Sequence, residues 1–346
     1  MADIDIRIEG CAGRITLNRP KALNALTYDM AMAIHAALRD WAGDDAVRLI
    51  VIDAAGDKAF CAGGDIADLY RTGTEGDFAY GRKFWADEYR MNAALFEFPK
   101  PVVSLMQGFT MGGGVGVGCH GSHRIVGDSS QIAMPECGIG LVPDVGGSMI
   151  LARAPGRLGE YLGTTAARLG AADAILAGFA DTYIPEGDWP ALIAELCRTG
   201  DVAAVAHAAQ SAPDGALAPQ MAEIDRHFAG ASLNDILASL RSEESAFTAA
   251  TLKSLSRNSP LSMACTVAMV QRLRGTDGIR PALDMEYRYT WRAMEQADFL
   301  EGIRAAIIDK DRNPRWRHDL DGVTPADVDA MLAPLGADAL TFEEEE

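Results

Sequence analysis

The sequence has no long apolar run, no C-x-x-C pair and a shortage of positive charge. No segment approaches the roughly 18 apolar residues that a membrane helix needs, and the N-terminal "MADIDIRIEG" lacks the basic flank and apolar stretch of a signal peptide. The 31 Lys and Arg residues against 49 Asp and Glu give a net charge of −18, which argues against a non-specific nucleic-acid or anionic-membrane surface. We therefore expect neither a nucleic acid nor a membrane as a partner.

Cysteines are few and scattered, at Cys11, Cys61, Cys119, Cys137, Cys197 and Cys265. This is the usage of reduced thiols that pack in an interior, and it predicts a cytoplasmic location. One of them, Cys119, stands close to His120 and His123, but the group has neither a fourth partner nor a carboxylate, which is too little for a zinc site. We expect no metal and no redox cofactor.

The composition, 49% hydrophobic and 23% charged, is that of an ordinary folded chain. Alternating isoleucines at residues 4–8 and the largely apolar runs at 47–53 and 102–108 predict strands, and residues 77–97 predict a helix between the two runs. This alternation indicates an α/β fold. Because an Ala-rich helical pattern begins near residue 190, we expect a core over residues 1–200, a helical region over 201–340 and a disordered acidic tail over 341–346.

Several helix starts can be predicted from their capping residues. Thr27 is placed to cap one helix, and Ser259 precedes a proline that suits the first position of another. Asp298 and Glu301 have the spacing of a capping box, in a helix that Pro314 would close.

The stretch "MPECGIGLVPDVGG", residues 134–147, sets Glu136 and Asp144 among apolar residues, glycines and prolines. Pro135 and Pro143 remove backbone donors and the glycines weaken any helical turn, so the stretch is interpreted as strand, loop and entry into a new element. Two acids on an apolar loop suggest a site.

Two glycine-rich segments follow buried strands, "FCAGGD" at 60–65 and "MGGG" at 111–114. Glycine allows close backbone approach, so two such loops could converge two N–H groups on one oxygen and form an oxyanion hole, the alternative being simple tight turns. The G-x-G-x-x-G pattern that begins at Gly116 does not indicate a dinucleotide site, because too few residues separate it from the next strand for a crossover helix.

Three motifs together resemble the crotonase (enoyl-CoA hydratase/isomerase) superfamily: "KAFCAGGDI" at 58–66, "GFTMGGGVGVG" at 108–118 and "MPECGIGLVPDVGGS" at 134–148. The similarity runs from about Ile4 to about Trp316 and is strongest to the 3-hydroxyisobutyryl-CoA hydrolase branch. The resemblance implies an α/β fold that spirals through repeated ββα units, with C-terminal helices covering the site. It also implies an acyl-CoA substrate and a homo-oligomer of the trimer or hexamer type.

The resemblance also implies roles for individual residues. The backbone N–H groups of Gly64 and Gly113 would form the oxyanion hole, and Glu136 and Asp144 would be catalytic. The expected CoA-binding residues are Lys58, Phe60, Ala62, Gly63 and Gly64.

One departure bears on the reaction. Hydratases of the family carry a second glutamate where this sequence has Gly116, and adding water across a C=C bond needs a cooperating acid and base. We therefore expect hydrolysis of a short 3-hydroxyacyl-CoA thioester, 3-hydroxyisobutyryl-CoA above all, as in valine breakdown. Glu136 could attack the carbonyl or deprotonate water, and both routes stay open. The alternatives are an enoyl-CoA hydratase or isomerase and a catalytically silent acyl-CoA-binding protein.

Overall fold

The computed structural model describes residues 2–342, which form two compact units. The sheet unit comprises the chain up to residue 65 together with 88–133 and 168–218, and the helical unit comprises 66–87, 134–167 and the chain from 219 onward. The boundaries expected near residues 200 and 340 divide the chain into fewer segments than these units do, and they stay a prediction. Residues 343–346 of the expected acidic tail lie outside the described residues.

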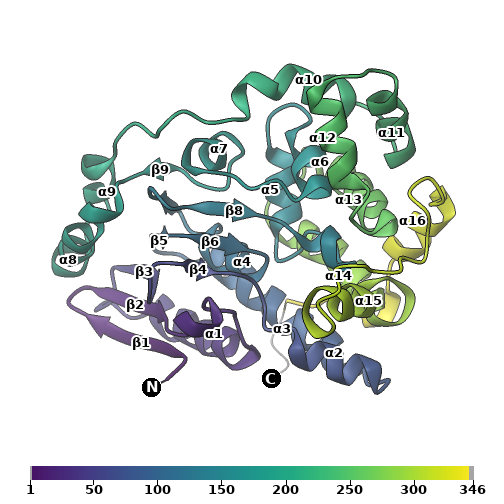
Figure 1. The fold of residues 1–346 in the computed structure, drawn as a ribbon. Helices are drawn as coiled ribbons and strands as arrows, with labels where there is room; N and C mark the ends of the chain where they lie inside the picture. The colour runs from purple at the N-terminus through teal and green to yellow at the C-terminus, as the bar shows by residue number, and fades with distance from the viewer. Residues whose placement is uncertain (1, 343–346) are drawn as a thin grey trace. The chain divides into compact units, whose positions relative to one another are not determined.

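The sheet unit holds two sheets (Figure 1). The larger has the order β1-β2-β3-β5-β7-β9, and the smaller has the order β4-β6-β8. β1 and β2 form an antiparallel hairpin, and every later pairing of these strands is parallel. The strands are β1 (Ile4–Glu9), β2 (Ala12–Leu17), β3 (Leu49–Ala54), β4 (Ala59–Cys61), β5 (Val102–Met106), β6 (Phe109–Met111), β7 (His123–Val126), β8 (Gln131–Ala133) and β9 (Thr182–Tyr183).

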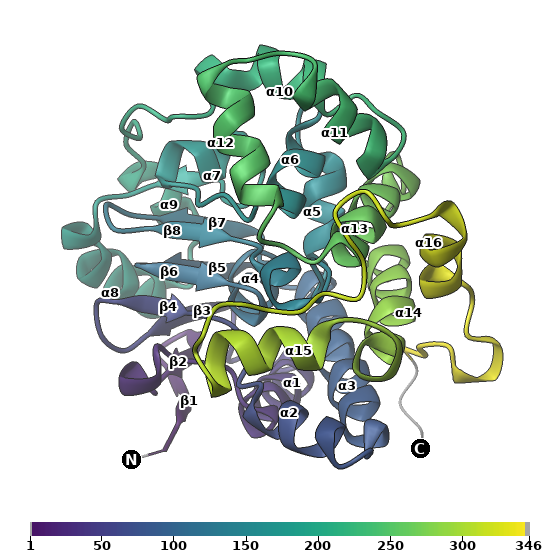
Figure 2. The ribbon, with the colours of Figure 1, turned by 45° about the vertical axis from the view of Figure 1, so that its right-hand side comes forward.

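From β3 onward, successive strands alternate between the two sheets. The pairs β3/β4, β5/β6 and β7/β8 each place one strand in the larger sheet and the next in the smaller, and Figure 2 shows the pairs stacked in this order. Helical segments follow each pair along the chain, so the fold is the expected spiral of ββα units. The glycine-rich segments stand at the ends of the first two pairs: residues 60–65 run from β4 into a loop, and residues 111–114 run from β6 into α4.

The sheet unit is held together by a core on one face of the larger sheet. Its apolar side chains, which include Leu49, Val103 and Ile125, pack against Trp189 and Leu192 of α8. Thr27 caps α1 as predicted, since its side chain accepts a hydrogen bond from the backbone N–H of Met30. The helices of this unit are α1 (Tyr28–Ala42), α4 (Gly113–Gly118), α7 (Ala171–Leu176), α8 (Trp189–Thr199) and α9 (Ala203–Ala208), with the C-terminal part of α3 (Phe78–Phe96).

The helical unit contains no strand among its described residues. α13, α14 and α15 pack around the segment that runs from Glu136 into α5. The helices of this unit are α2 (Ala67–Thr74), α5 (Gly147–Arg153), α6 (Leu158–Thr165), α10 (Met221–His227), α11 (Leu233–Arg241), α12 (Ala246–Leu255), α13 (Pro260–Leu273), α14 (Arg280–Gln296), α15 (Phe299–Ile303) and α16 (Pro325–Leu332). None of the helices within residues 2–342 has both the length and the apolar character that a membrane span needs.

The predicted start of α13 is confirmed and the predicted capping box of α15 is wrong. Ser259 caps α13 through a hydrogen bond from Ser262 N to its hydroxyl. Asp298 instead accepts hydrogen bonds from the Ser259 hydroxyl at 2.6 Å and from Arg317 N at 2.9 Å. Glu301 holds the Arg304 guanidinium. Tertiary partners have therefore replaced the local cap, and the chain continues past α15 as a π-helical turn over Arg304–Ile308.

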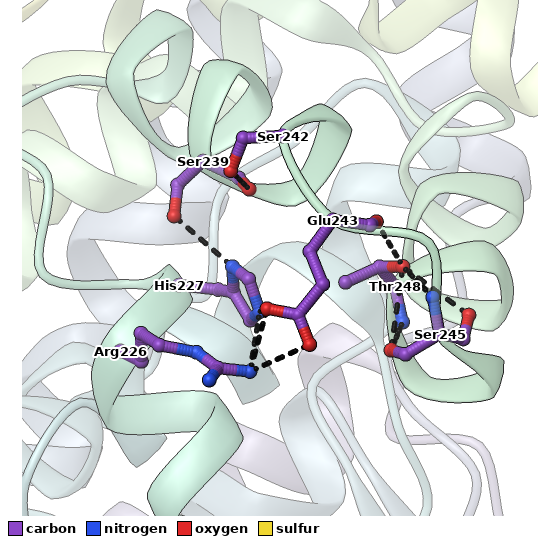
Figure 3. A network of polar contacts seen from close by, with 7 residues as sticks. All are labelled: Arg226, His227, Ser239, Ser242, Glu243, Ser245 and Thr248. Carbon is purple, nitrogen blue, oxygen red and sulfur yellow. Dashed lines mark hydrogen bonds and ion pairs between the residues drawn. The ribbon is translucent and has the colours of Figure 1, made fainter.

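A buried histidine joins α10 to the next two helices (Figure 3). His227 is 1% exposed, and its Nδ1 lies 3.0 Å from Oγ of Ser239 on α11. Its ring stacks on Phe247 of α12, and its Nε2 lies 3.7 Å from Glu243 Oε2. Glu243 in turn forms an ion pair with Arg226. The imidazole therefore fills space and links polar groups at the same time.

We expect His227→Ala to lower the free energy of unfolding by about 2–4 kcal/mol, because it leaves a cavity and removes the partner of the Ser239 hydroxyl. Urea denaturation measures this change. His207→Ala is the matched control, since His207 is exposed on α9. Equal stability of the two variants would contradict a structural role for the network.

Candidate active site

Glu136 opens a short 3-10 helix, Glu136–Ile139, where the sequence predicts only strand and loop. Four residues can complete such a turn despite the glycine, because a 3-10 turn needs few hydrogen bonds. Gly140 then adopts a left-handed φ of 75° and ends the turn. The loop continues through Asp144 to α5, which begins at Gly147.

The Glu136 carboxyl group is almost completely buried. Its residue is 4% exposed, and Oε2 has no hydrogen-bond partner among the described residues. Burial raises the pKa of Glu136 well above its usual range, and the charges of Asp144 and Glu286 raise it further. A desolvated carboxylate with one free oxygen is a stronger base and nucleophile than one in water.

Asp144 lies in the same unit and is 5% exposed. The loop turns sharply after it, because Val145 has a φ of 52° and Gly146 a φ of 80°. For a β-branched residue the left-handed region is unfavourable and costs on the order of 1–3 kcal/mol, so it persists only where neighbouring contacts enforce it. The strained turn therefore helps to set the position of Asp144.

A third buried carboxylate, Glu286 of α14, was not predicted from the sequence. It is fully buried and accepts hydrogen bonds from Gly146 N at 2.8 Å and Ser148 N at 3.0 Å, and the Ser148 hydroxyl also donates to it. Burial raises its pKa to about 8. Glu136, Asp144 and Glu286 thus form an acidic cluster in the helical unit.

Both glycines of the predicted oxyanion hole, Gly64 and Gly113, lie in the sheet unit. Gly113 is the first residue of α4, a position whose N–H has no intrahelical acceptor. A Cβ added to Gly113 would lie 3.3 Å from the nitrogen of Gly64, so the two backbones approach closely. Among residues 2–342 neither amide is engaged by a backbone carbonyl. Two free donors side by side suit an oxygen that becomes negative during reaction.

Glu88 of α3 adjoins this pair of glycines and is a second residue that the motifs did not reveal. It is 4% exposed, and its Oε1 lies 3.2 Å from where a Cβ on Gly113 would sit. Glu88 is spaced at helical intervals from the buried Phe84 and Met91, so it lies on the apolar face of α3. An acid on an apolar face is a sequence signal that could have found both Glu88 and Glu286.

The expected CoA-binding residues have different environments. Lys58 is exposed, whereas Ala62, Gly63 and Gly64 are partly buried. Gly63 has a φ of 121°, which only glycine adopts readily. Phe60 is 0% exposed within β4, so its side chain serves the core and any contact with CoA would come from its backbone.

The family can be assigned by comparison with known proteins. Residues 12–332 match the model of an enoyl-CoA hydratase/isomerase family. The chain belongs to this family. The resemblance to crotonases that the three motifs carry is therefore confirmed, and the chain is an enzyme of the crotonase fold.

The chain is similar to proteins named as a hydrolase, a hydratase and a dehydratase. The 3-hydroxyisobutyryl-CoA hydrolase, mitochondrial, of Rattus norvegicus is 39% identical over 99% of this chain and 91% of its own length, and that of Homo sapiens is 37% identical over 96% and 89%. A crystal structure of an enoyl-CoA hydratase from Rhodobacter sphaeroides 2.4.1 is 60% identical, with a TM-score of 0.95 over 98% of this chain and all of its own. A carnitinyl-CoA dehydratase from Mycobacterium thermoresistibile is 41% identical, with a TM-score of 0.94 over the whole of both chains.

The position at which the resemblance places the second glutamate of the hydratases lies in α4. Gly116 is buried there and has no side chain that could move a proton. Among the carboxylates that the structure buries are Glu88 in the sheet unit and Glu136, Asp144 and Glu286 in the helical unit.

Proposed function

We propose that the enzyme hydrolyses a short 3-hydroxyacyl-CoA thioester, 3-hydroxyisobutyryl-CoA above all, to the free acid and CoA. The observation that carries this proposal is the buried Glu136, whose Oε2 is free while Gly116 supplies no second acid. A strong base and a pair of free backbone donors are the groups that acyl transfer to water needs, whereas addition to a double bond needs a second acid or base. The curated relatives named as 3-hydroxyisobutyryl-CoA hydrolases support the same substrate.

In the proposed reaction an oxygen adds to the thioester carbonyl and the carbonyl oxygen becomes an oxyanion. The N–H groups of Gly64 and Gly113 stabilise that charge, and the C–S bond then breaks to release the CoA thiolate. Glu136 either takes a proton from the attacking water or adds first and forms a mixed anhydride that water hydrolyses. Asp144 orients the water or the substrate 3-hydroxyl. Single turnover in heavy-oxygen water separates the routes, because only the anhydride route labels the Glu136 carboxylate.

The purified protein should release free thiol from 3-hydroxyisobutyryl-CoA and 3-hydroxypropionyl-CoA without added metal. Among residues 2–342 no three His, Cys, Asp or Glu side chains are placed to share a metal ion, so a chelator should leave the rate unchanged. A thiol-reactive dye measures the release. Activity that a chelator abolishes and zinc restores would overturn the metal-free reaction.

Hydration is the second candidate function, because the 60% identical structure is that of an enoyl-CoA hydratase. Crotonyl-CoA decides between the two, since hydration removes its conjugated absorbance without releasing thiol. We expect hydrolysis of the 3-hydroxyacyl-CoA and no hydration of crotonyl-CoA. The reverse result would assign the enzyme to the hydratases.

A further inference from the structure

The loop that carries Asp144 is bonded at both of its ends to one helix, α14. At its start, the Tyr289 hydroxyl donates to the carbonyl of Gly140 at 3.2 Å. At its end, Glu286 accepts from the backbone N–H groups of Gly146 and Ser148. Glu286 and Tyr289 lie three residues apart and are both fully buried, so they share the inward face of α14.

The bonds to Glu286 need a carboxyl group in particular. Gly146 N donates to Oε2 at 2.8 Å, whereas Ser148 N and the Ser148 hydroxyl donate to Oε1. An amide has only one acceptor atom, so glutamine cannot accept at both positions. Between Asp144 and these bonds lies Val145, whose φ of 52° must be held by its surroundings.

We propose that Glu286 is a positioning residue for hydrolysis, which holds the strained Asp144–Ser148 turn so that Asp144 meets the substrate or water. This inference rests on the proposed function. It adds to Glu136 and Asp144 a residue that is far from them in sequence. It also explains why position 286 has a carboxyl group that accepts hydrogen bonds at both oxygens, which packing alone does not require.

The charge of Glu286 also acts on the reacting groups. Asp144 raises the pKa of Glu286, and Glu286 raises the pKa of Glu136, so the three acids influence one another. Because the pKa of Glu286 is itself about 8, its charge is present mainly above that pH. Glu286→Gln should therefore change the pH profile of kcat/KM in alkaline solution and little near neutral pH, an effect that a purely structural role would not produce.

The test is Glu286→Gln, measured as thiol release from 3-hydroxyisobutyryl-CoA. We expect kcat to fall about 10- to 100-fold, as displaced reacting groups do, with KM nearly unchanged. Glu295→Gln is the matched control, because Glu295 is an exposed glutamate of the same helix that pairs with Arg82. Ser148→Ala removes only the hydrogen bond from the Ser148 hydroxyl, so it should lower kcat less than Glu286→Gln does. It provides a second variant if Glu286→Gln folds poorly.

A double-mutant cycle with Asp144→Asn completes the test. If Glu286 acts through Asp144, Glu286→Gln should reduce the rate much less in the Asp144→Asn background than in the wild type. Equal losses in both backgrounds, or a wild-type rate for folded Glu286→Gln, would overturn the inference alone. Absence of thiol release by the wild-type enzyme would overturn the proposed function and the inference with it.

Discussion

Glu136→Gln should reduce thiol release by about 10²–10⁴-fold while leaving acyl-CoA binding intact. The amide keeps the size of the side chain but can neither attack a carbonyl nor accept a proton at neutral pH. Loss of a covalent route could cost at least as much. The rate of thiol release under saturating substrate measures the effect, and binding of a non-hydrolysable thioether analogue measures the affinity.

The stability of Glu136→Gln provides the control. Burial raises the pKa of Glu136 in the folded protein, so the folded state binds its proton more tightly than the unfolded chain does. The stabilisation from this group is complete below its unfolded pKa and is lost as pH rises through the folded value. A neutral glutamine should therefore leave the protein at least as stable at pH 8. Near-normal turnover by this variant would refute the proposed reaction.

Asp144→Asn extends the comparison. It should also lower turnover, though an amide could retain part of the orienting role. If the two acids act as one unit, the double variant should lose less than the sum of the two logarithms. Strictly additive losses would show that Glu136 and Asp144 work independently.

Local motifs predicted the parts of the site that occur close together in sequence. The paired acids Glu136 and Asp144 and the glycines Gly64 and Gly113 all lie in short segments whose glycines and prolines left few structural alternatives. The α/β alternation and the cap at Thr27 were likewise local, and the structure confirms both. Glycines in segments that fit neither a helix nor a strand pattern are informative, because they indicate close backbone approach.

The rest of the site depends on tertiary contacts. Glu88 and Glu286 occur in charged stretches of sequence that resemble solvated helix faces, and only their positions on the apolar stripes of α3 and α14 distinguish them. Asp298 shows the opposite error, because a good local cap pattern was overridden by bonds from Ser259 and Arg317. Capping energies of about 0.5–2 kcal/mol are small enough for buried polar partners to outweigh them.

Gly113→Pro should lower turnover by about 10²–10³-fold, because it removes one of the two donors to the oxyanion. Proline suits the first position of a helix, where the N–H lacks an intrahelical partner, so α4 should still form. Gly112, which precedes it, has a φ of 49° that glycine can retain. The loss should appear in kcat, since the charge develops only as the carbonyl is attacked.

Gly113→Ala separates the missing donor from simple crowding. Alanine keeps the N–H but adds a Cβ at 3.2 Å from Glu88 Oε1 and 3.3 Å from Gly64 N, which is tighter than most such contacts. A steric effect would therefore slow both variants alike, whereas a missing hydrogen bond slows the proline variant more. Circular dichroism and the melting temperature verify that each variant is folded. A folded Gly113→Pro enzyme with wild-type turnover would mean that the developing charge is stabilised elsewhere, because proline has no backbone N–H to donate.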